Sequence, residues 1–398
     1  MKIVFFLERQ IKNGNRYTLF GDFATLKWAR DFFQENVSQS PIEDDQEVPT
    51  GIRISGIKPG KRLFEESYYI LDTDGAQINR TEDTPFESYL IDYSNCQSDK
   101  GKVVIEAAKS FTPFKASGNM PAEELKAVLD SFPTNSENKN EYIKVNDVGQ
   151  GNWNEYHIGD MIPLVFDLGT NASKNAIKAL TDNILPTYES HKKPILVISH
   201  WDKDHYNCLL ILTPGELDLF ACFVIMETIP TATAEKAYKR IMNNPAAKVF
   251  AVPNISAPAT GHNVMKPLYS ATKVSLYQGI GKKSNESGLI VCVSNEKFLS
   301  VLSGDCAWFQ INHMLRLEAS NKMNRCCNLV IPHHGSGKDL SFKGFVIPYS
   351  WSYGSSAISV GNNTYKHPNP SVENYIDSLF GGHLSRTDYI KGPVYLKM

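Results

Sequence analysis

The segment ILVISHWDKDH at residues 195–205 constrains this chain more than any other. Its apolar start predicts a buried strand, and four polar side chains follow within six positions: His200, Asp202, Asp204 and His205. Alternate side chains of an extended chain point the same way, and a tightening turn would aim the last histidine at the same point. Two imidazoles and two carboxylates that converge at a strand end need a cation, so the segment predicts a metal site. A solvated polar turn is the alternative.

Three other apolar runs also end in residues of metal-binding type. FLSVLSGDC would present Asp305 at a strand end, NLVIPHHGS ends in His333 and His334, and KVNDVGQGN places Asp147 and a glycine-rich turn after a strand. Each string alone has an ordinary alternative, namely a turn, a polar surface segment or a hairpin. Together they indicate that imidazole and carboxylate ligands gather from several strand ends.

The order of these strings resembles a known family. DVGQG, FDLG, SHWDKDH, SGD, PHHGS and SVGNNTYKHPNP, within about residues 142–375, resemble the metallo-β-lactamase superfamily, and within it the hydrolase domain attached to the bacterial DNA-uptake channel family ComEC. The resemblance implies an α+β or α/β chain folded as a four-layer αββα sandwich, with a dinuclear metal site at one edge of the packed sheets.

The resemblance also implies a role for each polar residue, either as a metal ligand or as a group that orients a ligand. It implies His200 and Asp202 for the first metal, Asp204 and His205 for the second, Asp305 as the bridging carboxylate, and His333 or His334 as the late histidine of the second site. Asp147 and Asp167 match positions that orient ligating imidazoles by hydrogen bonding.

Two departures from the superfamily's commonest pattern affect the expected metals. Asp202 stands where histidine is usual, and an oxygen ligand hardens the first site, so we expect two divalent ions that are Zn²⁺ or Mn²⁺. A further histidine is often found before the GlyAsp strand, and His262 is the only candidate for it, without a supporting pattern around it.

Two metal ions that activate a water molecule suit phosphodiester hydrolysis, because the cations neutralise charge on the phosphate oxygens. We therefore expect a nuclease or phosphodiesterase that acts on a nucleic acid or nucleotide, with Asp204 in the catalytic centre. Residues 141–398 carry 24 Lys and Arg against 21 Asp and Glu, which is compatible with an anionic substrate. Hydrolysis of an ester, thioester or lactam is an alternative, as is a non-catalytic, metal-stabilised binding or sensor module.

The string SVGNNTYKHPNP at residues 359–370 predicts a polar loop before a helix. Asn363 and Lys366 are candidates for substrate binding, and His367 is the candidate general acid. The alternative is a capped helix start, with the prolines setting the turn and Ser371 near the N-cap.

A polar segment near residues 133–141 divides the chain, so we expect an N-terminal mixed α/β domain at 1–135 and the hydrolase domain at 136–398. The first region shows no chemical motif, and substrate selection or binding of a protein partner are equal possibilities for it. Seven cysteines without CxxC spacing, no signal peptide and no long apolar run predict a soluble, cytoplasmic protein without a membrane span.

Hydrophobic periodicity and turn residues predict the main elements. Strands are expected at 2–8, 16–20, 51–57, 67–71, 102–107, 143–148, 162–167, 195–199, 250–252, 288–293, 298–302 and 329–331. Helices are expected at 25–35, 121–131, 173–184, 232–243, 307–318 and 371–380.

Overall fold

The computed structural model places the chain in two compact units, which are described separately. It describes residues 1–38, 41–42, 46–58, 62–81, 88–94, 105–133, 140–189, 193–255, 265–281, 283–320, 322–361, 363 and 366–398. Unit 1 comprises Met1–Ala116 and Thr228–Arg240, and unit 2 comprises Ser117–Glu227 and Ile241–Met398. None of the helices in these ranges is long and apolar enough to cross a membrane.

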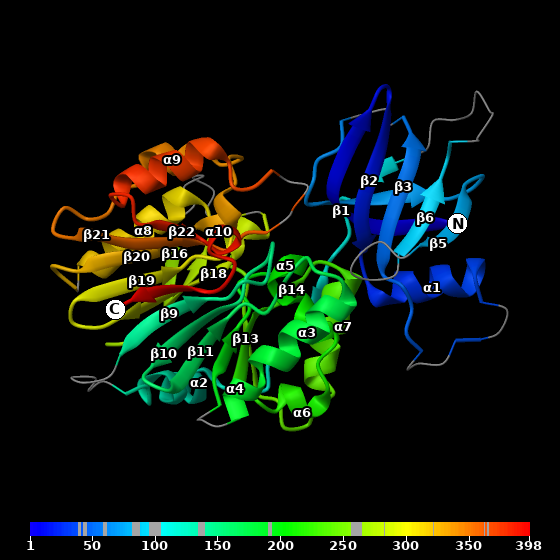
Figure 1. Ribbon diagram of the computed structural model, residues 1–398. Coiled ribbons are helices and arrows are strands. Elements are labelled where there is room, and N and C mark those ends of the chain that lie inside the picture. Colours follow the sequence, from blue (N-terminus) through cyan, green and yellow to red (C-terminus); the bar gives the residue numbers. More distant parts are fainter. Residues whose placement is uncertain are drawn as a thin grey trace. The chain divides into compact units, whose positions relative to one another are not determined.

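Unit 1 is built on a seven-stranded sheet in the order β5-β6-β3-β2-β1-β4-β7 (Figure 1). Its strands are β1 (Lys2–Asn13), β2 (Arg16–Phe23), β3 (Gly51–Ile57), β4 (Ser67–Asp72), β5 (Gln77–Thr81), β6 (Ser88–Asp92) and β7 (Ile105–Ala107). The helix α1 (Leu26–Asn36) follows the N-cap Thr25, whose side chain accepts a hydrogen bond from Trp28 N. Its buried face, with Phe32 among its residues, packs into the core of the sheet.

Residues 228–240 belong to unit 1 although they follow much of unit 2 in the sequence. β14 (Thr228–Ile229) pairs with β8 (Phe114–Lys115), and the helix α7 (Ala232–Met242) begins just after it. Glu235 on α7 accepts a hydrogen bond from Leu26 N at 3.0 Å. The boundary expected at residue 135 therefore differs from this division, which falls at residue 116 and returns a later segment to the first unit. Such a long-range return leaves no local signal in the sequence.

Unit 2 contains two seven-stranded sheets (Figure 1). The first sheet has the order β15-β13-β12-β11-β10-β9-β23, with β9 (Glu141–Val145), β10 (Asn154–Ile158), β11 (Met161–Phe166), β12 (Ile195–Val197), β13 (Cys222–Met226), β15 (Val249–Val252) and β23 (Val394–Lys397). The second has the order β16-β17-β18-β19-β20-β21-β22, with β16 (Met265–Ser270), β17 (Val274–Gly279), β18 (Leu289–Ser294), β19 (Phe298–Leu302), β20 (Cys326–Val330), β21 (Ser352–Ile358) and β22 (Leu384–Arg386). Each sheet joins an antiparallel part to a parallel part.

Helices accompany both sheets of unit 2. They are α2 (Ala122–Asp130), α3 (Lys174–Ile184), α4 (Pro186–Glu189), α5 (Lys203–Tyr206), α6 (Pro214–Leu217), α8 (Trp308–Ala319), α9 (Pro370–Leu379) and α10 (Thr387–Ile390). Ile311 of α8 and Ile376 of α9 share one apolar core with Leu329 of the second sheet. On the first sheet, Tyr188 of α4 donates a hydrogen bond to Glu155 of β10 at 2.9 Å. The structure is therefore a mixed α/β protein, as the sequence predicts at this level.

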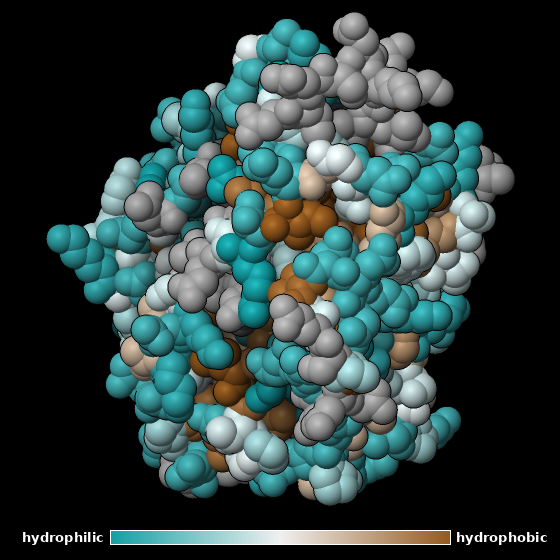
Figure 2. Space-filling model, turned by 90° about the vertical axis from the view of Figure 1, so that its right-hand side faces the viewer, coloured by the Kyte–Doolittle hydropathy of each residue, from teal (hydrophilic) through white to brown (hydrophobic). Residues whose placement is uncertain are grey.

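The chain has an ordinary apolar fraction of 42%. Figure 2 shows a face that is mainly hydrophilic, with hydrophobic side chains in smaller, separate areas. Buried apolar side chains instead fill the cores of the sheets, as in the core that the second sheet shares with α8 and α9.

Candidate metal centre

The candidate centre lies where strands of both sheets of unit 2 end. His200 follows β12 of the first sheet, and Asp204 and His205 lie in the short helix α5 that comes next. Asp305 follows β19 of the second sheet, and His334 follows its parallel neighbour β20. Parallel strands end at the same edge of a sheet, which brings Asp305 and His334 together, and the contact between the two sheets adds His200, Asp204 and His205.

The two sheets are joined at this edge by their backbones. Leu289 N, at the start of β18, donates a hydrogen bond to Ser199 O at 2.8 Å, and His333 N donates to Gly304 O at 3.1 Å. Gly304 has a φ of +52°, and a Cβ atom there would lie 2.8 Å from the Cβ of Ser199. Glycine therefore allows the loop that carries Asp305 to approach the loop that carries His200.

One group of possible ligands consists of His200, His205 and Asp305, whose ligand atoms all lie within 4.8 Å of one another. His205 Nε2 is 3.2 Å from Asp305 Oδ1, and His200 Nε2 is 4.0 Å from Asp305 Oδ2. Asp202 Oδ2 lies 3.4 Å from His200 Nε2. All four residues were predicted ligands, and the structure brings them together.

A second group consists of Asp204, His205 and His334. His334 Nε2 lies 3.2 Å from Asp204 Oδ2, and His205 Nε2 lies 3.9 Å from Asp204 Oδ1. His205 belongs to both groups, so the groups overlap and form one continuous cluster.

Four atoms in this cluster are buried and lack a hydrogen-bond partner among the described residues: His200 Nε2, His205 Nε2, His334 Nε2 and Asp305 Oδ1. Two of them, on His205 and Asp305, are only 3.2 Å apart and still form no hydrogen bond. Buried polar atoms without partners are costly and uncommon. Nitrogen and oxygen atoms that converge without bonding one another fit a shared cation, so these residues fit divalent metal ions.

The other nitrogen of each ring is held by a hydrogen bond, which orients the imidazole. His205 Nδ1 is 2.8 Å from Asp167 Oδ2, and His334 Nδ1 is 2.8 Å from Ser359 O. Both partners accept, so the Nδ1 atoms carry the protons and the Nε2 lone pairs face the cluster. Ser199 Oγ, 2.9 Å from Asp167 Oδ2 and 2.9 Å from His200 Nδ1, extends the same arrangement to the third ring.

Asp167 thus contacts the imidazole of a candidate ligand, whereas Asp147 does not among the described contacts. The half-buried carboxyl of Asp147 accepts a hydrogen bond from the backbone of Gly149, and burial raises its pKa. Ser199 and the carbonyl of Ser359 contact the imidazoles of candidate ligands, although the sequence motifs did not predict a role for them. Ser199 stands directly before His200, where the strand ends, which was the only local signal for it.

The histidines and carboxylates of the cluster shift one another's pKa values. Burial lowers the pKa of His205, but Asp305 and Asp167 raise it well above the ordinary value. Burial likewise lowers the pKa of His334, and the nearby carboxylate of Asp204 raises it overall. Burial raises the pKa of Asp305, but His333 and His205 hold it well below its usual range. At neutral pH, protons on His205 and His334 thus supply the positive charge that bound metal ions would supply in this cluster.

The two adjacent histidines of the HHGS string differ in position. His334 is buried and belongs to the second ligand group. The side chain of His333 is 31% exposed, and its Nδ1 lies 3.5 Å from Asp305 Oδ2 and 3.1 Å from Asn285 Nδ2. Both histidines have positive φ values, of 51° and 49°, which is unusual for two successive non-glycine residues and typical of functional sites.

The loop before α9 brings His367 beside the cluster, with ring centroids of His367 and His333 5.7 Å apart. Burial, followed by the charges of His333 and His334, lowers the pKa of His367 to about 4. A neutral imidazole at pH 7 donates a hydrogen bond but is a poor acid, so this environment does not favour the predicted role of His367 as general acid.

The other candidates in this loop have different surroundings. The amide of Asn363 donates to Gly361 O and His367 O, both at 2.9 Å, and its oxygen accepts from His367 N at 3.1 Å. These contacts indicate that Asn363 positions the loop rather than a substrate. Lys366 is exposed. The cap of α9 is Asn369, whose side chain accepts from the backbone of the predicted cap Ser371. His262 lies outside the described residues.

Comparisons with known proteins add little to this geometry. Neither a family model nor a curated protein matches the chain. Among solved structures, CmlA, a diiron beta-hydroxylase from Streptomyces venezuelae, is similar at 10% sequence identity and a TM-score of 0.35, over 65% of this chain and 54% of that one. A mutant of CmlA matches at 10% identity and a TM-score of 0.34, over 76% of this chain and 65% of that one. The match therefore spans about half of the CmlA chain, and TM-scores this low support no conclusion about this protein.

Proposed function

We propose that this protein is a metal-dependent hydrolase whose centre holds two divalent ions. The observation that carries the proposal is the set of four buried atoms that lack a hydrogen-bond partner in the described part of the chain, contributed by His200, His205, His334 and Asp305. A packed protein rarely leaves four such atoms together unless a ligand satisfies them. Two ions bound there would lower the pKa of a bound water and neutralise charge on a substrate oxygen.

The donor atoms suggest which metals to test. The second group offers one carboxylate and two imidazoles, and the first offers the same types, joined by the nearby carboxylate of Asp202. Mixed nitrogen and oxygen donors suit Zn²⁺ and Mn²⁺, and two histidines with one carboxylate also suit iron. Metal analysis of the purified protein should therefore measure zinc, manganese and iron together.

We further propose that the substrate is a phosphodiester in a nucleic acid or nucleotide. Support comes from the resemblance of the motifs to the DNA-uptake hydrolases and from the mildly basic composition of residues 141–398. Two bound metal ions would neutralise the negative charge on phosphate oxygens well. The exposed amine of Lys366 and the neutral imidazole of His367 lie on one loop, which suits contact with phosphate oxygens.

The fold proposed for unit 2 is the αββα sandwich of the metallo-β-lactamase superfamily. Its support is the pair of mixed seven-stranded sheets, with α8 and α9 in the core of the second sheet and α4 bonded to the first. The centre at the strand ends of both sheets agrees with this arrangement. For unit 1 we propose a role in selecting the substrate or binding a protein partner.

The test compares the wild-type protein with Asp204→Ala and with Asp182→Ala, an exposed carboxylate on α3. Metal content and hydrolysis of a bis-aryl phosphodiester and an aryl ester are measured on the same samples. We expect Asp204→Ala to lose bound metal and to lower phosphodiester turnover by more than the ~10–100-fold typical of residues outside the ligand set. Asp182→Ala should retain both.

Three results would contradict the proposal in different ways. Unchanged turnover in Asp204→Ala would remove the centre from catalysis. Cleavage of the ester alone would replace the substrate class with a carboxylic ester, thioester or lactam. Absence of any turnover by metal-replete protein would favour a binding or sensor module.

A further inference from the structure

Four neighbouring strands of the second sheet, β19, β20, β21 and β22, run parallel and therefore end at the same edge. Asp305 follows β19 and His334 follows β20, and both belong to the candidate metal centre. Ser359 directly follows β21, and Thr387 directly follows β22. The edge that carries two candidate ligands therefore continues to two residues that belong to neither ligand group.

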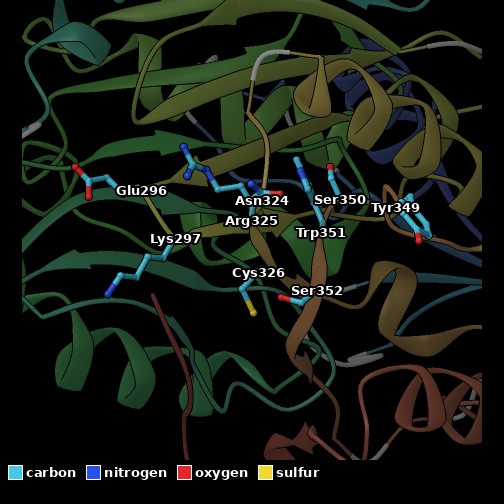
Figure 3. Close-up of a pocket in the computed structure, with 9 residues that line it drawn as sticks. All are labelled: Glu296, Lys297, Asn324, Arg325, Cys326, Tyr349, Ser350, Trp351 and Ser352. Atoms are coloured by element: carbon cyan, nitrogen blue, oxygen red, sulfur yellow. The ribbon is translucent and has the colours of Figure 1, made fainter.

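The opposite edge of these strands has a different character. Figure 3 shows a depression there, where β20 and β21 begin, in which the side chains of Lys297 and Arg325 point apart and Tyr349 lies at the far end of the group. The side chains that line this depression thus do not converge on one point. Polar groups converge instead at the edge where the strands end.

Hydrogen bonds run along that edge from Thr387 to the ring of His334. The hydroxyl of Thr387 accepts a hydrogen bond from Val360 N and donates one to Val360 O, both at 3.0 Å. The carbonyl oxygen of the preceding residue, Ser359, lies 2.8 Å from His334 Nδ1 and accepts its hydrogen bond. The threonine is thus linked to a candidate ligand through one short piece of backbone.

The link is a single peptide unit, because Ser359 O and Val360 N belong to the same peptide bond. The atoms of a trans peptide unit lie in one plane, with the C=O and N–H groups on opposite sides. A hydroxyl that fixes the N–H therefore also fixes the direction of the carbonyl. Hydrogen bonds at both ends of one peptide also polarise and strengthen each other. Thr387 holds one end of this unit, and His334 binds the other.

Further contacts fix both ends of the link. The hydroxyl of Ser359 donates to Gly151 O, in a loop of the first sheet, at 2.5 Å. At the other end, the residue before the threonine is Arg386, which donates to both oxygens of Glu373 on α9, at 2.9 and 3.0 Å. Arg386 also donates to Asp388 on α10, at 2.6 and 3.0 Å. The threonine hydroxyl therefore projects from a fixed backbone.

Burial makes the threonine hydroxyl hard to replace. Thr387 is fully buried, and Ser359 and Val360 are buried beside it. Backbone N–H and C=O groups that are removed from water need hydrogen-bond partners. Without the hydroxyl, the polar groups of Val360 would lose the partner that they have in this structure, and the peptide would turn to find another.

We propose that Thr387 is a positioning residue of the metal centre, which holds the Ser359 carbonyl so that the ring of His334 keeps its proton on Nδ1 and its Nε2 faces the second ligand group. The inference rests on the proposed function, because it assigns a role in binding one of the two metal ions. His334 Nε2 is buried without a hydrogen-bond partner among the described residues, and it lies 3.2 Å from Asp204 Oδ2. Rotation of the ring would turn this lone pair away from the second group but would not affect the first group, which lacks His334.

The first test is stepwise binding of Zn²⁺ to metal-stripped, full-length protein in competition with a chelator. Thr387→Val keeps the branched shape but removes the hydroxyl, and we expect it to weaken one of the two binding steps about tenfold. This lies at the lower end of the ~10–100-fold range for groups that orient metal ligands. The other step should be unchanged. Thr387→Ser keeps the hydroxyl and should restore the affinity.

Thr181→Val is the matched control. Thr181 is also fully buried in unit 2, on α3, and its hydroxyl donates to Lys178 O at 2.9 Å. This variant loses a buried threonine hydroxyl away from the centre, so it should bind both ions as the wild type does. Circular dichroism checks that each variant folds. Thr387→Ala removes the hydroxyl with a smaller side chain and repeats the comparison if valine prevents folding.

A measurement without metal separates this inference from the proposed function. In metal-free protein labelled with ¹⁵N-histidine, the Nδ1 proton of His334 can be assigned by its loss in His334→Gln. It should exchange slowly with water in the wild type, Thr181→Val and Thr387→Ser, and faster in Thr387→Val. Slow exchange that depends on Thr387, in a wild type that binds fewer than two ions, would contradict the proposed centre but support the positioning of the ring.

Three results would overturn the positioning role. The first is a Thr387→Val protein with the Zn²⁺ affinity and the proton exchange of the wild type. The second is an equal loss in Thr387→Val and Thr181→Val, which would reflect a general loss of stability. The third is a Thr387→Ser protein that behaves like Thr387→Val, which would show that the hydroxyl is not the group that matters.

Discussion

His205 is the residue on which the candidate centre depends most. Its Nε2 belongs to both ligand groups, while its Nδ1 is fixed by Asp167 at 2.8 Å. The ring is fully buried between two carboxylates, so it has to carry a proton or face a cation. The nearby carboxylates favour a positive charge at this point, and they therefore raise the pKa of His205 and of His334.

Metal affinity should therefore rise with pH. A raised pKa means that His205 and His334 keep their protons above the value of about 6.5 that is usual for histidine, so a metal ion has to displace protons until the pH exceeds the raised pKa. Titration of Zn²⁺ or Mn²⁺ into metal-stripped protein, in buffers of different ionisation enthalpy, should show proton release that diminishes as the pH rises. An affinity that stays constant between about pH 6 and 8 would contradict this expectation.

His367 provides a second test at the residue scale. Its pKa of about 4 leaves it neutral at pH 7, so we expect it to bind the substrate as a hydrogen-bond donor. His367→Gln keeps a donor and should lower kcat/KM by about tenfold or less. A general acid would instead contribute ~10²–10⁴-fold, so a loss in that range, with loss of the corresponding limb of the pH–rate profile, would restore the acid assignment.

At the scale of elements, the site depends on close approach of loops that leave the strand ends. Gly169, in the loop after β11, illustrates this: a Cβ atom there would lie 2.3 Å from the backbone C and O of Asp204 and 2.5 Å from His205 N. Those atoms are backbone and cannot move aside like the end of a side chain. The short helix that carries two proposed ligands is therefore held against a glycine.

Gly169→Ala should displace this helix. We expect a loss of about 1–3 kcal/mol in the free energy of unfolding, as for overpacking of a core, and a clear fall in metal content. Gly215→Ala on α6 is the matched control, because a Cβ atom there meets nothing within 4 Å. Chemical denaturation and metal analysis of both variants measure the effect, and equal behaviour of the two would refute the packing argument.

Several strands were predictable from their apolar runs, but the buried apolar strand β13, with the sequence CFVIM, and the alternating strand β6 were missed. β3 and β19 have the same bounds in the structure as in the sequence analysis, and α1, α3 and α7 lie within one or two residues of their predicted limits. β10, with the sequence NEYHI, was missed although it is buried throughout. Its Glu155 is buried against Asn146, Tyr188 and His157, and such a long-range network is not visible in a local pattern.

At the scale of the whole molecule, the chain passes between the two units more than once, because Thr228–Arg240 returns to unit 1. Thr233 contacts Asp22 and Thr50 by hydrogen bonds, and Tyr68 OH donates to Pro230 O at 2.8 Å. A segment far along the chain thus depends on contacts with Asp22, Thr50 and Tyr68 of unit 1.

A fragment of residues 136–398, cut at the boundary that the sequence suggested, should therefore leave this segment without its partners. We expect α7 to lose protection from hydrogen exchange and to become open to trypsin at Lys236 and Lys239, compared with the full chain. Thr233→Val in the full chain is a milder control, which removes only its hydroxyl contacts. Equal protection of α7 in the fragment and in the full chain would show that unit 2 holds this helix alone.

The sequence by itself determined which residues gather at the centre. Seven candidate ligands follow predicted strands: His200, Asp202, Asp204, His205, Asp305, His333 and His334. Parallel order within the second sheet brings Asp305 and His334 to one edge, and the contact between the two sheets adds the residues that follow β12. The mixed α/β class followed from the same alternation of runs. The identities of the candidate ligands were local information, because these residues stand at the positions where apolar runs stop.

Only the tertiary structure decided how these residues share the site. It made His205 common to both groups, buried His334 beside Asp204 while leaving His333 partly exposed, and placed Ser199 and Ser359 behind the rings. These outcomes depend on rotamers, on approaches between chain segments and on burial, all of which arise from contacts between residues that are distant in sequence. A linear pattern carries no signal for them.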